Sequence, residues 1–370
     1  GWPKPALIKR EDFPETSLMP SESIQAAASA YAYPLLIKQL LHTPLATAAD
    51  QEIVYRDSHR QTYRDLAARI RRLANSLRDA GVGPGDTVAV MDWDSHRYLE
   101  CFFAVPMMGA VLQTVNVRLS PEQILYTLNH AGADIVLVNA DFIPVLAGIK
   151  GQLETVKRFV LISDTGNDMA MWQIPFVGEY EALLAKASSE YDFPDFDENT
   201  RATTFYTTGT TGLPKGVYFS HRQLVLHTLA VATHLGTAEG HGRLHRGDEY
   251  MPITPMFHVH AWGVPYIATL LGLKQVYPGR YAPETLARYI HDEKVTFSHC
   301  VPTILQMLLT NAEAKAVDLK GWKVLIGGSA FPKGLATAAL ERGIDVFCGY
   351  GMSETCPILT VARVPGDLPA

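Results

Sequence analysis

"ATTFYTTGTTGLPKGVYFSHRQ", residues 202–223, holds the pattern on which the fold prediction rests. Its first six residues are mostly β-branched or aromatic, which predicts a strand. Its last four residues form a capping box, with Ser220 as N-cap and Gln223 three residues later, which predicts the start of a helix. A strand, a glycine-rich loop and a helix in this order predict an α/β fold, with the loop at the carboxyl end of a strand. Open α/β sheets bind ligands at that end.

The glycine-rich loop suits phosphate, but it is not a Walker A loop. Counted from Gly209, Lys215 falls at the Walker lysine, yet Pro214 stands where the second glycine belongs and Gly216 where the metal-binding hydroxyl belongs. Glycine N–H groups, threonine hydroxyls and a lysine charge nevertheless all favour an anion. A flexible surface loop is the alternative, and the flanking strand and helix argue against it.

Strands and helices alternate along the rest of the chain, which predicts mostly parallel, doubly wound sheets. The acidic, proline-containing stretch 191–200 is typical of a linker. We therefore expect a first α/β subdomain at 1–195 and a second at 196–370, the latter carrying the nucleotide motifs. We predict helices at 31–41, 63–80, 97–108 and 121–131, and strands at 51–57, 86–93, 110–117, 134–140, 203–206, 250–254, 274–276, 297–299, 324–326 and 345–347.

Composition excludes several classes of function. The chain has 370 residues, of which 47% are hydrophobic and 19% charged, as in globular proteins. A net charge of −6 gives no case for nucleic-acid binding. Proline or glycine interrupts the longest apolar runs, so no transmembrane segment is expected. Four cysteines without paired spacing are typical of a reducing compartment, which predicts a cytoplasmic protein.

Three further motifs follow predicted strands. "VLIGGSAFPKG" and "VFCGYGMSETCP" each place glycines after a strand, and the second adds a carboxylate, Glu354. A carboxylate beside hydroxyls can hold Mg²⁺, although a glutamate in the first turn of a helix is the alternative. "PITPMFHVHAWG" adds two histidines, which alone are a weak metal signal. Glycines, hydroxyls, one lysine and one glutamate at strand ends together fit a site for ATP and Mg²⁺.

The motifs "YTTGTTGLPKG", "PMFHVHAW", "GGSAFP" and "GYGMSET" also stand in the order and approximate spacing of the adenylate-forming (ANL) superfamily. The chain resembles the bacterial long- and medium-chain fatty-acyl-CoA synthetases, and "LECFFAVPMMGAVLQTVNVRLSPEQILYTLNHA", residues 99–131, is similar to that branch. The resemblance implies the large N-terminal domain of that fold, layered αβαβα. It also implies an ATP-dependent fatty-acid–CoA ligase that uses Mg²⁺ and CoA. A carboxylate would attack ATP to give acyl-adenylate and pyrophosphate, and CoA would then displace AMP.

The resemblance also implies roles for residues that match the family motifs. Catalytic roles fall to Lys215, His258 and Glu354. Thr207 and Glu354 match the pair associated with Mg²⁺. His258 and Trp262 match the acyl tunnel, with a buried aromatic anchor as the alternative for Trp262. Residues matched to ATP or AMP binding are Thr207, Thr208, Gly209, Thr210, Thr211, Gly212, Lys215, Gly328, Ser329, Ala330, Cys348, Gly349, Tyr350, Gly351 and Ser353. Cys348 stands where glutamine or asparagine is common, and Ser353 where threonine is usual.

The chain stops at Ala370, soon after "GYGMSET". On the resemblance we expect the ribose-binding aspartate and the C-terminal domain to be absent, and this chain alone to be inactive. Two alternatives stay open: a ligase for a short thioether or branched carboxylate, and a catalytically incomplete nucleotide-binding fragment. The expected partners are a fatty acid, ATP and CoA. Peripheral membrane contact, a homodimer and the acyl-chain length are left open.

Overall fold

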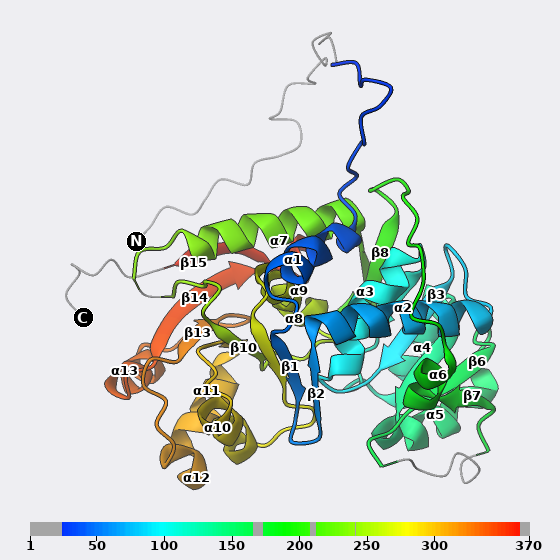
Figure 1. The fold of residues 1–370 in the computed structure, drawn as a ribbon. Coiled ribbons are helices and arrows are strands. Elements are labelled where there is room, and N and C mark those ends of the chain that lie inside the picture. The colour runs from blue at the N-terminus through cyan, green and yellow to red at the C-terminus, as the bar shows by residue number, and fades with distance from the viewer. Residues whose placement is uncertain (1–23, 166–172, 208–211, 241, 363–370) are drawn as a thin grey trace, which may run out of the picture. The chain divides into compact units, whose positions relative to one another are not determined.

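The computed structural model describes residues 24–165, 173–207, 212–240 and 242–362 (Figure 1). The chain divides into two units, Gly1–Pro34 and Leu35–Ala370. The described part of the first unit, residues 24–34, forms neither helix nor strand. All further elements belong to the second unit.

Two sheets organise the second unit (Figure 1). Neighbouring strands are parallel except β1–β2, β14–β15 and β8–β9, which are antiparallel. In sheet order, the first sheet consists of β15 (Ile358–Ala362), β14 (Asp345–Gly351), β13 (Lys323–Ile326), β12 (Phe297–Cys300), β10 (Glu249–Pro252), β11 (Lys274–Tyr277), β1 (Glu52–Tyr55) and β2 (His59–Thr62). The second consists of β7 (Phe176–Glu179), β6 (Arg158–Ile162), β5 (Ala133–Asn139), β3 (Thr87–Met91), β4 (Val111–Thr114), β8 (Arg201–Thr207) and β9 (Lys215–Ser220).

Helices cover both faces of both sheets. The α-helices are α1 (His42–Thr47), α2 (Tyr63–Asp79), α3 (His96–Met107), α4 (Pro121–Ala131), α5 (Ile143–Ile149), α6 (Tyr180–Lys186), α7 (His221–Gly236), α8 (Val259–Trp262), α9 (Val264–Leu271), α10 (Pro283–Asp292), α11 (Pro302–Thr310), α12 (Ala312–Lys315) and α13 (Lys333–Glu341). The 3₁₀ helices are η2 (Ile37–Leu41), η3 (Ala140–Phe142), η4 (Lys150–Gln152) and η6 (Ser353–Thr355). Among the described residues, no helix is both long and apolar enough to cross a membrane.

The buried apolar residues form layers between these elements. Helices α10, α11 and α13 pack on one face of the first sheet, and α7 and α9 pack on the other. Helices α4 and α5 pack on one face of the second sheet, while α2, α3 and α6 pack on its other face and also meet β1. The predicted α/β class, with two mostly parallel sheets in helical layers, is confirmed.

Two local features differ from the expectation, and a third agrees with it. The predicted helix at 31–41 is a 3₁₀ helix, η2, followed by α1. Pro34 explains the later start, because the residue before a proline disfavours helical geometry. The glycine loop does not lead straight into a helix: β9 pairs antiparallel with β8, and α7 begins only after it. The predicted capping box is present at the start of α7, where the Ser220 hydroxyl accepts the N–H of Gln223.

The two sheets do not follow the predicted division at residue 195. β8 and β9 follow that residue yet join β3 to β7, whereas β1 and β2 precede it yet pair with β11. The subdomains 1–195 and 196–370 stay a prediction. The linker 191–200 has no helix or strand, as its composition indicates.

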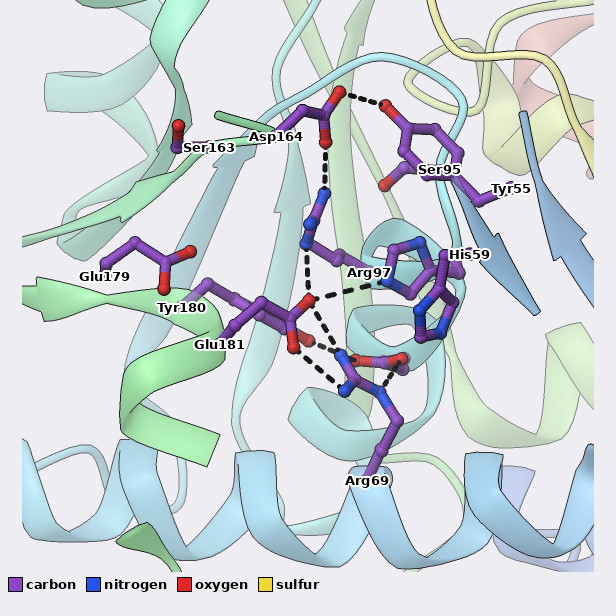
Figure 2. Close-up of polar contacts among 12 residues, drawn as sticks. Tyr55, His59, Arg69, Ser95, Arg97, Ser163, Asp164, Glu179, Tyr180 and Glu181 are labelled. Carbon is purple, nitrogen blue, oxygen red and sulfur yellow. Dashed lines mark hydrogen bonds and ion pairs between the residues drawn. The ribbon is translucent and has the colours of Figure 1, made fainter. Parts of the chain in front are cut away.

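Helix α3 lies between the sheets, and all of its residues are buried. It nevertheless carries Arg97 and Glu100, so these charges require partners inside the protein. Arg97 forms ion pairs with Asp164 at 2.8 Å and Glu181 at 2.7 Å (Figure 2). Arg69 of α2 forms ion pairs with Glu181 at 2.9 Å and Glu100 at 2.6 Å.

Hydroxyl groups complete this ion network. The Tyr180 hydroxyl donates to Glu100 at 2.6 Å, and the Tyr55 hydroxyl donates to Asp164 at 2.8 Å (Figure 2). Tyr55 lies on β1 in the first sheet, whereas Tyr180 is the first residue of α6, which packs on the second sheet. The network therefore joins layers that belong to different sheets.

Candidate functional site

The β8–β9 hairpin carries the predicted phosphate residues. Thr207, the last residue of β8, pairs directly with Lys215, the first residue of β9. Directly paired residues of an antiparallel ladder point to the same face, so the hydroxyl and the ammonium share one side of the hairpin. Lys215 is exposed, and Gly212 lies in the turn before it. Thr208, Gly209, Thr210 and Thr211 lie outside the described residues.

The 3₁₀ helix η6 lies beside β9, which brings the acidic motif to the hairpin. Glu354 is exposed on η6, and Ser353 precedes it. The Thr355 hydroxyl accepts the N–H of Met352 at 3.0 Å and so fixes the start of this turn. The structure thus places the strand that bears Lys215 next to the 3₁₀ helix that bears Glu354.

A pocket of about 260 Å³ opens at the carboxyl ends of β13 and β14. Seven of the predicted site residues line it: His258, Trp262, Gly328, Gly349, Tyr350, Gly351 and Ser353. Its other walls come from Val259, Leu325, Gly327, Met352, Pro357 and Ile358. Four motifs that are far apart in the sequence therefore meet at one cavity or beside it.

Glycine is required at the base of this pocket. A Cβ on Gly327 would lie 3.0 Å from the Gly349 carbonyl oxygen and 3.1 Å from the Trp262 ring. A Cβ on Gly351 would lie 1.7 Å from the Pro357 carbonyl oxygen. The backbone strands thus approach each other too closely for any side chain.

The remaining predicted residues differ in their relation to the pocket. Tyr350 is 63% exposed at its rim, so one ring face is open to a ligand. Ser329 and Ala330 follow the lining residue Gly328 but do not themselves line the pocket. Cys348, on β14, is half-buried and also does not line it.

The segment that bears Trp262 has an unusual backbone. Val259, His260, Ala261 and Trp262 have φ values of 48°, 55°, 48° and 58°, and Gly263 follows at 73°. These are left-handed conformations, which cost on the order of 1–3 kcal/mol each for residues other than glycine. The label α8 therefore covers a left-handed turn, and its strain is concentrated at the pocket wall.

Trp262 is 5% exposed and packs against a buried histidine. The Trp262 and His299 rings lie 5.1 Å apart at 34°. The Nε2 atom of His299 hydrogen-bonds the Tyr250 hydroxyl at 2.8 Å. Trp262 is consequently supported from β10 and β12, so it is both a pocket-lining residue and a buried aromatic.

Desolvation and a nearby positive charge both favour a neutral His258 imidazole. The surrounding protein lowers the pKa of His258 by desolvation, and the positive Arg118 lowers it further.

Asp94 lies behind the segment that bears His258, where its carboxyl group accepts the N–H of Met256 at 2.7 Å. Burial raises the pKa of Asp94 to about 8, despite that hydrogen bond.

Sequence reasoning missed several residues that shape the site. Asp94, His299 and Tyr250 carry no motif, and only the folded chain brings them behind the pocket. His260 was weighed only as a metal ligand, whereas its ring lies among aromatic side chains. Its place in an otherwise apolar run, "VHAW", was the available signal.

Comparison with known proteins identifies the family. The family described as "AMP-binding enzyme" matches residues 41–370. This chain belongs to the AMP-binding enzyme family. The resemblance to the adenylate-forming superfamily is therefore confirmed.

Curated relatives in the family are CoA ligases. The chain is 42% identical to a long-chain-fatty-acid–CoA ligase of Thermus thermophilus, over 84% of this chain and 55% of that protein. It is 37% identical to a 3-methylmercaptopropionyl-CoA ligase of Ruegeria lacuscaerulensis, over 90% of this chain and 62% of that protein. It is also 37% identical to a medium-chain-fatty-acid–CoA ligase of Ectopseudomonas oleovorans, over 81% of this chain and 55% of that protein. The chain spans little more than half the length of these relatives.

Solved structures share the fold. An anthranilate CoA ligase, AuaEII, in complex with anthranoyl-AMP, matches with a TM-score of 0.81 at 21% identity, over 91% of this chain and 64% of that one. A fatty acyl CoA synthetase of Mycobacterium tuberculosis matches with a TM-score of 0.74 at 22% identity, over 87% of this chain and 60% of that one. The layered architecture of the family is thus present here.

Proposed function

We propose that the protein containing this chain is an ATP-dependent fatty-acid–CoA ligase. In the first step a carboxylate oxygen attacks the α-phosphorus of ATP, and the bond to pyrophosphate breaks. In the second step the CoA sulfur attacks the acyl carbonyl, and AMP leaves. The observation that carries the proposal is the convergence of the Thr207–Lys215 pair and η6 with the pocket lined by His258 and Trp262. The identity to fatty-acid–CoA ligases supports the choice of reaction.

The proposed roles follow the chemistry of each side chain. Lys215 and the hydroxyl of Thr207 hold the β- and γ-phosphates, since they face the same side of the hairpin. Tyr350 stacks on adenine with its exposed ring face. His258 and Trp262 border the carboxylate and the acyl chain. Further ATP- or AMP-binding residues are proposed at Thr208, Gly209, Thr210, Thr211, Gly212, Gly328, Ser329, Ala330, Cys348, Gly349, Gly351 and Ser353.

Mg²⁺ fits the residues beside the hairpin. Glu354 offers a carboxylate and Thr207 a hydroxyl, and Mg²⁺ prefers oxygen ligands together with substrate phosphates. When bound, the ion would neutralise charge on the phosphates. Lys215 and Thr207 would orient them, which is most of what a protein contributes to such a transfer.

A ligase for a short thioether carboxylate is the second candidate. The pocket measures about 260 Å³, and Trp262 closes one side of it. A relative at 37% identity is named for 3-methylmercaptopropionate. A panel of acids from C3 to C16, with 3-methylmercaptopropionate included, separates the two candidates by the acid with the highest kcat/KM for acyl-CoA.

We also propose a cytoplasmic location. All four cysteines, Cys101, Cys300, Cys348 and Cys356, are free thiols, which supports a reducing compartment.

Replacing Lys215 with alanine tests the proposed function. The exposed side chain has little part in the core, so the melting temperature should stay within about 2 °C of the parent's. Loss of a charge-assisted contact should cost roughly 1.5–3 kcal/mol, or about 10- to 150-fold in kcat/KM for ATP. The readout is acid-dependent pyrophosphate release by the full-length protein. Lys186→Ala, which removes an exposed lysine from α6, is the matched control. Equal rates for both variants would contradict the role of Lys215.

Replacing Glu354 with glutamine tests the metal role. The amide keeps the size and polarity of the side chain but loses the charge that attracts Mg²⁺. Loss of a supporting group alone can weaken metal binding by roughly 10- to 100-fold, so the Mg²⁺ concentration for half-maximal rate should rise at least about tenfold. Glu341→Gln, exposed on α13, is the control. Overlapping Mg²⁺ titrations for parent and variant would show that Glu354 is only a helix residue.

A further inference from the structure

Two histidines lie at the turn that bears Trp262: the buried His260 within it and the half-buried His227 behind it. His260 is fully buried within that turn, and neither of its ring nitrogens has a hydrogen-bond partner among the described residues. His227, on α7, has a buried Nε2 atom that is also unpaired within the described part of the chain. Buried polar atoms are nearly always paired in native proteins, so three such nitrogens in one place need an explanation.

The side chains around His260 are mostly aromatic. Its ring lies 5.6 Å from the Phe102 and Phe205 rings, 6.4 Å from Phe219 and 6.2 Å from Tyr266. The Tyr266 hydroxyl donates to the Phe102 carbonyl oxygen at 3.1 Å and makes no hydrogen bond to His260. The imidazole therefore lies in an aromatic cage in which neither ring nitrogen has a partner among the described residues.

Both histidines lie close to the wall of the proposed substrate pocket. A Cβ on Gly263 would lie 3.0 Å from the His227 ring, and the Ile358 backbone hydrogen-bonds that ring. Ile358 and Trp262 both line the pocket. His227 therefore stands directly behind the pocket wall, and His260 belongs to the turn that forms it. Neither ring lines the pocket itself, so an acyl chain reaches the two histidines only by displacing the Trp262 side chain.

Both imidazoles are neutral at pH 7. Burial lowers the pKa of His227 to about 4 and that of His260 to about 3, and His227 lowers the pKa of His260 further. A neutral imidazole has one N–H donor and one acceptor nitrogen. The two rings together thus offer both a donor and an acceptor to a ligand.

We propose that His227 and His260 bind a hydroxyl group on the acyl chain of the substrate, so that the preferred acid is a hydroxylated carboxylic acid. The inference rests on the proposed ligase function. A hydroxyl is the smallest group that both donates and accepts, and it matches a pair of neutral imidazoles. An acid with a plain alkyl chain leaves the ring nitrogens unpaired, so the protein binds it less tightly than the hydroxylated acid.

The test compares octanoate with the six monohydroxyoctanoates that carry the hydroxyl at C3 to C8. The full-length protein is supplied with ATP, Mg²⁺ and CoA, and kcat/KM is measured by acyl-CoA chromatography. We expect at least one hydroxy isomer to exceed octanoate by about tenfold, chiefly through KM. The ratio of kcat/KM for the best hydroxy acid to kcat/KM for octanoate should fall to within about twofold of one in His260→Phe and in His227→Phe. His234→Phe, a matched change at an exposed position of α7, should keep the parent's ratio.

Each outcome bears on the inference. Octanoate as good as every hydroxy isomer overturns it while leaving the ligase function standing. No acyl-CoA from any acid overturns both. Melting temperatures give a second reading: His260→Phe should melt at or above the parent's temperature, because it removes an unpaired polar group. A fall of more than about 5 °C would show that phenylalanine does not fit this fully buried site, and the ratio in His227→Phe would then decide. Should His260→Phe not fold, the ratio in His227→Phe decides.

Discussion

Glu100→Ala is expected to lower the free energy of unfolding by about 3–5 kcal/mol. The Glu100 side chain is fully buried and pairs with Arg69 at 2.6 Å, while the Tyr180 hydroxyl donates to it. Alanine removes the negative charge but leaves the guanidinium, which is 17% exposed and cannot reach water freely. Arg69 keeps Glu181 as a partner at 2.9 Å, so the cost is that of a buried ion network that loses one of its carboxylates and leaves the Tyr180 hydroxyl without its acceptor.

Chemical denaturation followed by far-UV circular dichroism measures this effect. Glu52→Ala is the matched control, because Glu52 pairs with Arg60 at 3.2 Å on the surface, where the two side chains are 46% and 50% exposed. Exposed pairs contribute about 0–1 kcal/mol. A Glu100→Ala variant as stable as Glu52→Ala would show that the ion network between the sheets is dispensable.

Asp94→Asn is expected to stabilise the protein by on the order of 4 kcal/mol at pH 7. Burial raises the pKa of Asp94 from 3.8 to about 8, so the folded protein holds this carboxyl protonated where the unfolded chain ionises it. A protonated carboxyl and an asparagine amide each offer one carbonyl acceptor and a donor. Asparagine can therefore accept the Met256 N–H without the cost of keeping a proton.

The sign of the pH dependence follows from the raised pKa. The folded state binds the extra proton between pH 4 and 8, so the stability contributed by Asp94 is complete below its unfolded pKa of 3.8 and is lost as pH rises. The gain from Asp94→Asn should grow from near zero at pH 4 to its maximum near pH 8. Thermal unfolding of both proteins at several pH values measures it.

Asp92 supplies a contrast to Asp94. It accepts hydrogen bonds from Ser95 at 2.6 Å, from Asn139 at 2.7 Å and from the Trp93 N–H at 2.8 Å. An amide donor placed among these donors would lose at least one of the bonds, so Asp92→Asn should destabilise. A gain in stability from Asp92→Asn, or a flat pH profile for Asp94→Asn, would contradict the account.

Local sequence patterns predicted the elements whose signals are local. Helix α4 occupies the predicted residues, because Ser120, Pro121 and Gly132 mark its two ends. β9 was missed because it begins with a lysine and a glycine, which are poor strand formers. The place of β1 and β2 in the first sheet could not be predicted, since it depends on pairing with β11 more than 200 residues later.

The residues of the candidate site also fall into those that a local sequence motif predicts and those that only the folded chain brings together. Its motif residues were found because each follows a strand in one continuous stretch, and the topology then brings the strand ends together. Glu100 was predicted to lie in a helix, but its partners Arg69 and Tyr180 come from separate helices. His227 and Asp94 carry no sequence signal of their own, so only the packed structure shows them behind the pocket.

The left-handed turn before α9 restricts how the length of this segment can change in related chains. Handedness reverses at Gly263, since α9 begins at the next residue and is right-handed. One residue inserted or deleted there would rotate His258 and Trp262 away from the pocket, whereas most exchanges of side chain would not. Substitutions can therefore change the side chains of this pocket wall, whereas the number of residues between His258 and α9 is constrained.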